Sequence, residues 1–351
     1  MKKIILFTHN DLDGYGCFIL LKTSIGMRGD DVNLYTNFCG IDEVSNSIIN
    51  FVESGSYKYY DEIIITDIAI NQEAAEILDS VKDSIKIKLF DHHKTALWLN
   101  EKYEWATVYI KNEIAGRLTS ATEILYQYLL TNNFLNQFDK RVMNQLSLLV
   151  TMIMRWDTWQ WTDGIFNNKE RDLNTLFINE SDKEKFALGI VKRIINNEGI
   201  ITEDDENKIN IYNNIKDKYI NDNKSKFYEC KFGNYNAALF INELYFSEFA
   251  NTMAKDYPNI DIIMNYIPYS NKVELRTIKD NIDLSVLAKS MTDGKLTGGG
   301  HQKAAGFPVN KSVTSAILDS FIEAIERYSD AVTEKGTSDI YIKNIIKIGE
   351  E

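Results

Sequence analysis

Cysteine, proline and long hydrophobic runs are scarce in this chain of 351 residues. Its three cysteines are odd in number and far apart, so neither a disulfide scaffold nor a zinc–cysteine cluster is indicated, and we expect a reducing, cytoplasmic setting. Three prolines and 18 glycines exclude a collagen-like or low-complexity architecture. The apolar run at residues 4–7 is too short for a signal peptide, and no stretch approaches the ~20 apolar residues of a membrane-spanning helix. We therefore expect a soluble protein with no membrane partner.

Positive charge is also in short supply. Lysine and arginine total 39 against 51 acidic residues, which gives a formal net charge of -12. Long nucleic acid is bound through a broad basic surface, so long duplex DNA is not expected as a partner. A short anionic substrate in a local pocket is compatible with this charge.

The apolar content is sufficient for two domains. Hydrophobic residues make up 44% of the chain, and at roughly 150 residues per domain the length predicts about two. In the first third, strand-like and helix-like stretches alternate, which predicts a mostly parallel sheet with helices on both faces. The expected strands are residues 3–8, 32–38, 62–66, 85–90 and 105–110, and the expected helices are residues 14–25, 43–52 and 74–81.

The remainder predicts a helical stretch, a connector and a smaller domain. Residues 120–154 have helical spacing, and the polar residues 182–226 are expected to form exposed connecting helices. Strands are then expected at 235–241, 261–267 and 272–278, and helices at 284–290 and 316–328. The predicted fold class is thus α/β. An α/β domain at 1–180 is joined by a helical connector at 181–226 to a smaller mixed α/β domain at 227–351.

Histidine is rare, and all four histidines lie in polar or glycine-rich clusters: His9, His92, His93 and His301. The first three follow expected strands and stand next to aspartates. Ligands bind beyond the carboxyl ends of the strands in parallel sheets, so we expect the residues that follow neighbouring strands to meet at one edge.

Several aspartates at this edge have two interpretations. His9, Asp11 and Asp13 alternate, so their side chains can converge on a metal ion, although a single aspartate there would also serve as a helix N-cap. Asp67 follows a strand and can likewise cap the next element. Imidazole and carboxylate ligands without thiolates suit Mn²⁺, Zn²⁺ or Fe²⁺, and the excess of carboxylates favours Mn²⁺ or Mg²⁺.

Two further segments also have two interpretations each. Asp157 lies in a tryptophan-rich segment and requires a partner, either Arg155 or a metal ion, and we favour the metal. The run of Gly298, Gly299 and Gly300 before His301 is either a flexible loop or, with the helix-compatible segment that follows it, an anion cradle at a helix N-terminus.

Taken in order, these segments resemble the motifs of the DHH phosphoesterase family. The matching segments are HNDLDG at 9–14, ITD at 65–67, FDHHKT at 90–95 and RWD at 155–157. GGGHQKAAGF at 298–307 resembles the glycine-rich motif of the family's associated substrate-binding domain. The resemblance extends from residue 4 to about residue 330. The short interval between His9 and Asp11 argues against a pyrophosphatase and is found in the family's oligoribonucleases and in some of its exonucleases.

The resemblance implies a centre with two divalent metal ions, usually Mn²⁺, and a role for each matching residue. His9 and Asp11 would hold one ion. Asp13, His92 and Asp157 would hold the other. Asp67 would bridge both ions, and Asp91 would orient a ligating histidine from behind. His93 would contact the scissile phosphate or assist the leaving oxygen. The substrate's terminal phosphate or adjoining nucleotide would be held by Arg276, Gly298, Gly299, Gly300 and His301.

The activity that we expect is Mn²⁺-dependent hydrolysis of short RNA oligonucleotides to mononucleotides. Cyclic dinucleotides, 3′-phosphorylated nucleotides and single-stranded DNA are alternative substrates, and a non-catalytic nucleotide sensor is an alternative of another class. The sequence leaves the direction of digestion and the oligomeric state open, a homo-oligomer included.

Overall fold

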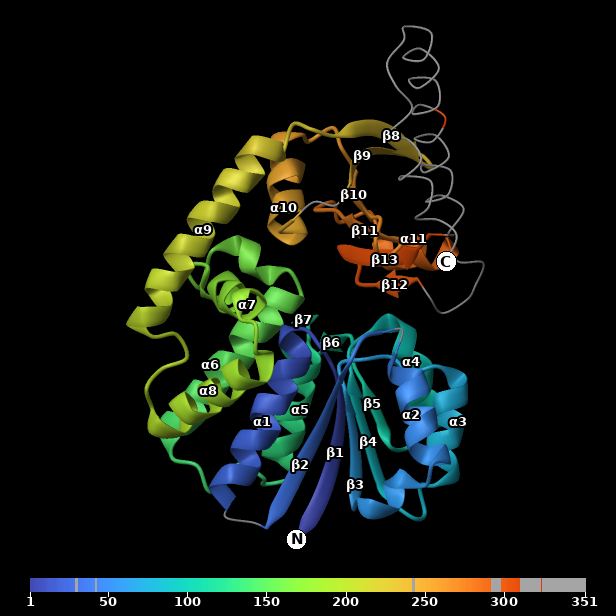
Figure 1. The fold of residues 1–351 in the computed structure, drawn as a ribbon, viewed down its shortest axis with the longest axis vertical. Helices are drawn as coiled ribbons and strands as arrows, with labels where there is room; N and C mark the ends of the chain where they lie inside the picture. The colour runs from blue at the N-terminus through green and yellow to red at the C-terminus, as the bar shows by residue number, and fades with distance from the viewer. Residues whose placement is uncertain (29–30, 42, 242–243, 292–297, 310–322, 324–351) are drawn as a thin grey trace, which may run out of the picture.

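The protein is built around two sheets that follow one another along the long axis of the molecule (Figure 1). The computed structural model describes residues 1–28, 31–41, 43–241, 244–291, 298–309 and 323. The long helix α9 (Glu203–Asn223) runs from the first sheet's domain to the second (Figure 1). Within the described residues, none of the helices combines the length and the apolar character required to cross a membrane.

The first sheet has five parallel strands in the order β2-β1-β3-β4-β5. They are β1 (Lys2–His9), β2 (Val32–Cys39), β3 (Glu62–Thr66), β4 (Lys86–Asp91) and β5 (Ala106–Val108). The chain moves from β1 to β2 on one side and then to β3 on the other. The strand order therefore reverses between β1 and β3, which is where open α/β sheets bind their ligands.

Successive residues of these strands enter different cores, because side chains alternate between the two faces of a sheet. Ile63 and Ile65 of β3 belong to one core and Ile64 to the other. The face of Ile64 is covered by α1 (Leu12–Arg28), α5 (Ala121–Thr131), α6 (Lys140–Asp157) and α8 (Lys183–Asn196). The opposite face is covered by α2 (Val44–Glu53), α3 (Gln72–Ser80) and α4 (Leu97–Lys102).

Short elements complete this domain around the carboxyl edge of the sheet. They are η2 (Lys94–Ala96), the hairpin of β6 (Lys111–Asn112) and β7 (Arg117–Leu118), η3 (Gln160–Asp163) and α7 (Lys169–Asn179), whereas η1 (Ser56–Tyr59) precedes β3 at the opposite edge.

The second sheet is mixed and has the order β12-β13-β11-β10-β9-β8. Only β9 and β10 are parallel, and the other neighbouring strands are antiparallel. Its elements are β8 (Tyr228–Phe232), β9 (Tyr235–Ile241), α10 (Phe246–Asp256), β10 (Ile262–Ile267), β11 (Lys272–Arg276), α11 (Leu284–Ser290), β12 (Gly299–Gly300) and β13 (Ala304–Pro308). Together the two sheets confirm the expected fold class.

One part of the predicted connector packs differently from the expectation. The sequence predicts exposed helices over 181–226, yet α8 lies against α1 and buries Ala187, Ile190 and Ile194 in the first domain's core. These three side chains recur at helical spacing and form one apolar stripe between polar neighbours, which the polar composition of the segment conceals. The helix expected at 316–328 lies outside the described residues, apart from Glu323.

Candidate metal centre

The residues that follow β1, β3 and β4 meet at the carboxyl edge of the first sheet. His9 ends β1, Asp67 follows β3, and His92 follows β4, and these three strands are neighbours. Among the groups of side chains with potential ligand atoms within 4.8 Å of one another, two contain the expected metal ligands: His9, Asp11 and Asp67 in the first, and Asp13, His92 and Asp157 in the second. The structure thus brings together all six residues that the sequence singles out as metal ligands.

In the first group, the two oxygens of Asp11 have different partners. Asp11 Oδ2 lies 2.9 Å from His9 Nδ1, and the same nitrogen lies 3.7 Å from Asp67 Oδ2. Asp11 Oδ1 accepts hydrogen bonds of 3.1 Å from the backbone amides of Asp13 and Gly14, at the start of α1. One carboxylate therefore serves both as a helix cap and as a member of the acidic cluster.

In the second group, three carboxylates surround one nitrogen of His92. Its Nε2 lies 3.2 Å from Asp67 Oδ1, 3.4 Å from Asp157 Oδ2 and 3.6 Å from Asp13 Oδ2. The two oxygens of Asp67 therefore face the two groups. His92 Nε2, Asp67 Oδ2 and Asp157 Oδ2 are buried without a hydrogen-bond partner. Buried polar atoms without partners are costly, so these atoms indicate a missing ligand.

Backbone groups orient the second group. His92 Nδ1 donates to the carbonyl oxygen of Thr119 at 2.8 Å, which leaves the lone pair of Nε2 free for a cation. The carboxylate of Asp13 accepts from the amides of Ala121 and Thr122 at 2.8 and 3.0 Å, in the first turn of α5. Sequence reasoning misses these partners, because a backbone amide or carbonyl carries no signal of its own.

Asp91 holds the ring of His93. Its Oδ1 lies 2.7 Å from His93 Nδ1 and also accepts from the backbone amide of His92 at 2.8 Å. The resemblance implies that Asp91 orients a ligating histidine. The structure instead shows Asp91 behind His93, while the ring of His92 is held by Thr119.

Burial and like charges make this cluster unfavourable without a counter-charge. Burial, together with the nearby Asp11 and Asp13, raises the pKa of Asp67 well above its usual range. Burial likewise raises the pKa of Asp157 to about 7. Although burial lowers it, the pKa of His9 rises to about 11 because the carboxylate of Asp11 stabilises the imidazolium. Asp67 also has a φ of 58°, in the left-handed region where non-glycine residues are strained.

The observed donor set fits divalent cations. It consists of imidazole nitrogens and carboxylate oxygens without thiolates, and several of its buried atoms lack partners. Arg155 does not compete for Asp157, because its Nε donates to Glu170 at 2.6 Å and its guanidinium also pairs with Asp163. Of the two partners that the sequence allows for Asp157, the arginine is therefore engaged elsewhere.

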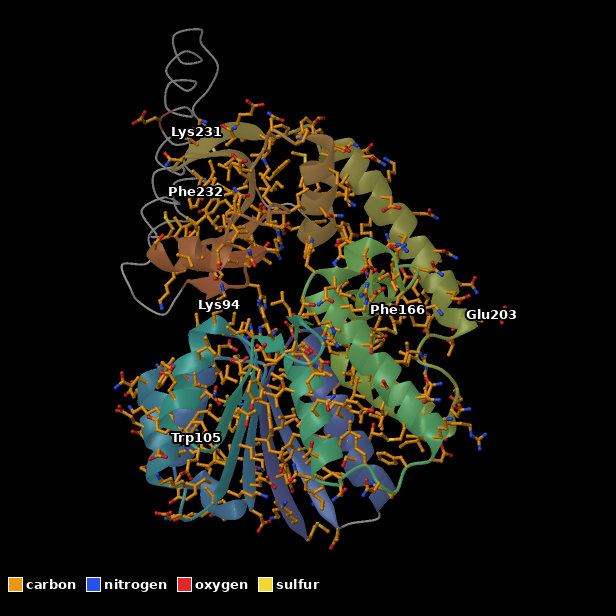
Figure 2. All side chains as sticks on the ribbon, turned by 180° about the vertical axis from the view of Figure 1, so that it is seen from behind. Lys94, Trp105, Phe166, Glu203, Lys231 and Phe232 are labelled. Atoms are coloured by element: carbon orange, nitrogen blue, oxygen red, sulfur yellow. The ribbon has the colours of Figure 1, made fainter. Side chains whose placement is uncertain are left out.

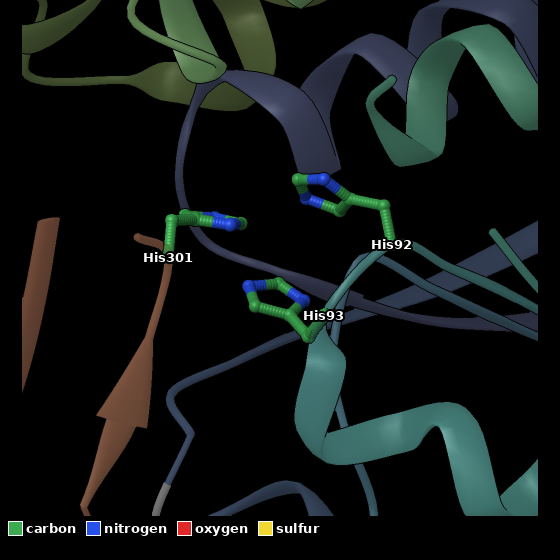
Figure 3. Close-up of side chains that lie close together, drawn as sticks. All are labelled: His92, His93 and His301. Atoms are coloured by element: carbon green, nitrogen blue, oxygen red, sulfur yellow. The ribbon is translucent and has the colours of Figure 1, made fainter. Parts of the chain in front are cut away.

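The second domain contributes a histidine to this edge. Figure 3 shows the rings of His92, His93 and His301 facing one another, with His301 coming from the turn after β12. The ring centroid of His301 lies 4.8 Å from that of His92 and 4.8 Å from that of His93. Burial, with His92 and His93 nearby, lowers the pKa of His301 well below its usual value, so its ring is neutral at neutral pH.

Arg276, at the end of β11, has no anionic partner within the part of the chain that the structure describes. Its Cζ lies 5.3 Å from the ring centroid of Phe246 and 6.0 Å from that of Trp159. Its Nε is buried without a hydrogen-bond partner. A guanidinium held against aromatic rings in this way is available to an anion.

The glycine run forms a strand, so the expected cradle at a helix N-terminus is wrong. Gly299 and Gly300 make up β12 and pair with Gly306 and Ala305 of β13, so a strand rather than a helix follows His301. Gly300 has a φ of 132°, and a Cβ there would lie 2.6 Å from the Ala304 carbonyl oxygen. The glycines therefore allow close strand approach. Gly298 is buried beside them.

The fold and the cluster of histidines and carboxylates define a candidate metal centre at the edge of a parallel sheet, and comparisons with known proteins show the family to which the chain belongs. No family model matches the chain. Oligoribonuclease NrnB of Bacillus subtilis (strain 168) is 34% identical over 320 residues, which cover 90% of this chain and 74% of NrnB.

Two solved structures share the fold at low identity. The exonuclease RecJ bound to manganese has a TM-score of 0.51 at 13% identity, over 91% of this chain and 88% of that chain. RecJ of Thermus thermophilus in complex with Mn²⁺ has a TM-score of 0.52 at 13% identity, over 94% of this chain and 52% of that chain. The chain belongs to the DHH phosphoesterase family, as its motifs predict.

Proposed function

We propose that this protein is a metal-dependent nuclease that hydrolyses short RNA oligonucleotides to mononucleotides. The observation that carries this proposal is the pair of donor groups that share Asp67, with buried ligand atoms lacking other partners. The name of the relative NrnB, an oligoribonuclease, supports RNA as the substrate.

The chain's residues suit a centre for two cations, for which we propose Mn²⁺. His9 and Asp11 would hold one ion, Asp13, His92 and Asp157 the other, and Asp67 both. When bound, such a pair lowers the pKa of a water molecule and stabilises the attacking and leaving oxygens of a phosphodiester. Thr119 fixes the His92 tautomer that this requires.

The remaining residues of the site position the substrate and move a proton. Asp91 accepts from His93 Nδ1, so the ring presents Nε2 to the phosphate and can deliver a proton to the leaving oxygen. Arg276 and His301 would hold the phosphate at one end of the substrate. In this arrangement the domain proposed at 1–180 cleaves, and the domain proposed at 227–351 holds the substrate.

Charge favours a short substrate. A chain with a net charge of -12 has few phosphate contacts to offer outside the site, whereas long nucleic acid requires many. A small number of cationic groups at the site is sufficient for an oligomer of a few nucleotides.

A substrate panel at fixed Mn²⁺ concentration tests the proposal. Initial rates are compared for end-labelled RNAs of two to five nucleotides, a cyclic dinucleotide, a 3′-phosphorylated nucleotide and single-stranded DNA. We expect the highest kcat/KM on the short RNAs. Intact RNAs would overturn the proposal, and faster cleavage of another substrate would reassign it. Cleavage of none of them, together with the absence of stoichiometric metal from the untreated protein, would favour the alternative of a non-catalytic nucleotide sensor.

A further inference from the structure

A cavity of about 340 Å³ opens beside the carboxylates of the metal centre. Asp11, Asp13 and Asp157 form one end of it, and none of its lining residues is a histidine. The rest of its wall comes from Asn10 and Leu12, from the end of α6, from α7 and from the start of α8. The cavity is therefore separate from the surface where His93, His301 and Arg276 would hold a phosphate.

The cavity has an apolar wall, and the polar residue Asn174 lies beside it. Trp156, at the end of α6, and Ile178, in α7, contribute the apolar surface. Asn174 of α7 is only 8% exposed, and its side-chain amide makes no hydrogen bond to any residue that the structure describes. Because this amide has no partner among the described residues, it is available to donate to, and accept from, a ligand in the cavity.

Lys183 also lines the cavity, but it is not available to a ligand. Its Nζ donates to the carbonyl oxygens of Phe177, Ile178 and Glu180 at 2.6, 3.0 and 2.6 Å. An ammonium group has three donors, and all three are used at the end of α7. The cavity therefore lacks a free cation for a second phosphate, and its chemistry suits a neutral group that is flat and carries polar edges.

We propose that the cavity receives the nucleobase of the nucleotide next to the scissile phosphate, with Asn174 hydrogen-bonded to the base edge. This inference rests on the proposed function. The volume of the cavity lies at the lower end of the range for ligand pockets, and it suits one nucleoside rather than a longer strand. An amide offers a donor and an acceptor to any base, and an aromatic wall accepts every base face. The nuclease would thus bind one nucleoside in each cleavage event without strong base preference.

Product binding tests this assignment directly. The affinities of the Mn²⁺-loaded protein for adenosine monophosphate and for ribose 5-phosphate, which lacks the base, are measured by calorimetry. In the wild type we expect the nucleotide to bind more tightly, and Asn174→Leu should reduce this affinity ratio by about tenfold. The control is Asn179→Leu on the same helix, which is exposed and outside the cavity lining, and should keep the wild-type ratio.

A second variant covers the case in which a change at buried Asn174 impairs folding. Ile178 is 44% exposed, so Ile178→Trp should fold, fill the cavity and weaken binding of adenosine monophosphate more than binding of ribose 5-phosphate. An unchanged ratio in both folded variants would overturn the inference. If the wild type leaves short RNAs intact, the proposed function itself fails, whereas cleavage of RNA with an unchanged ratio rejects only the cavity assignment.

Discussion

Asp67 concentrates several unfavourable features in one residue. It is 1% exposed, has a left-handed backbone conformation, and lies among other carboxylates. Its oxygens are directed at His9 on one side and at His92 on the other. Strain and buried charge of this kind persist where they serve a site, and a cation that binds between the two groups would offset them.

Replacing Asp67 with asparagine separates these effects, because asparagine tolerates the same φ and removes only the charge. We expect Asp67→Asn to lower Mn²⁺-dependent hydrolysis by at least about 100-fold. The metal-free variant should be more stable than the metal-free wild type by about 1 kcal/mol, because a like charge is removed. Hydrolysis rates with added Mn²⁺ measure the first effect, and thermal unfolding in the presence of a chelator measures the second. The exposed Asp83→Asn is the control, and full activity of Asp67→Asn would contradict the role of a shared ligand.

At this scale, the sequence reveals side chains but not their backbone partners. The alternation of His9, Asp11 and Asp13, and the positions of Asp67 and His92 after strands, are visible in the sequence. The carbonyl of Thr119 is not, because its role depends on where the chain after the β6–β7 hairpin returns to the sheet. Asn174 is equally unremarkable in the sequence, since only the packing of α7 leaves its amide beside the carboxylates.

Among the elements, the segment from α6 to α7 determines where Asp157 lies. Arg155 joins the end of α6 to Glu170 of α7 and to Asp163 of η3, and it also donates to the carbonyl oxygen of Gln160 at 2.9 Å. Glu170 is fully buried. This ion-pair network holds the end of α6, and with it Asp157, against the first domain.

We expect Arg155→Met to destabilise the protein by about 3 kcal/mol, because it leaves the carboxylate of Glu170 buried without its partner. The double variant Arg155→Met/Glu170→Leu should recover most of this loss, since it removes the unpaired charge as well. Urea unfolding measures both. A loss below about 1 kcal/mol in the single variant, or no recovery in the double variant, would show that the pair is not what stabilises this segment.

Helices and strands can be predicted where the hydrophobic periodicity of the sequence is strong. They are harder to predict where pairing with a distant strand determines the local structure. The strand expected at 62–66 coincides with β3, because its run of isoleucines is buried on both faces. The segment after His301 has small residues that are compatible with a helix, and it becomes β13 because it pairs with Lys272–Arg276 of β11. That partner is remote in the sequence, so local preference could not reveal it.

Over the whole molecule, the two domains are joined by a chain connection and by side-chain contacts. The helix α9 connects them through the chain, and Lys94, beneath the second domain in Figure 2, reaches Asp283 at the start of α11. The Nζ–Oδ2 distance of this ion pair is 2.5 Å. Lys94 follows His93, so the ion pair acts on the same edge at which His301 approaches the first domain.

Asp283→Asn removes this charge and keeps an oxygen that can accept from Ser285 N at the start of α11. The ion pair is partly exposed, so its contribution is modest, and we expect KM for short RNA to rise about two- to fivefold with kcat little changed. The salt dependence of KM should also weaken. The control is Asp280→Asn, whose carboxylate is fully exposed and pairs with Lys303. A fall in kcat at unchanged KM would contradict a role in bringing the domains together.

The position of His301 close to His92 and His93 has a consequence for incomplete chains. The six proposed ligands lie from His9 to Asp157, whereas the groups proposed to hold the phosphate, Arg276 and His301, are synthesised after them. A nascent or prematurely terminated polypeptide would therefore have its metal ligands before it had the groups that bind RNA. Such a fragment could bind metal ions without holding an oligonucleotide, so cleavage would require a chain that includes His301.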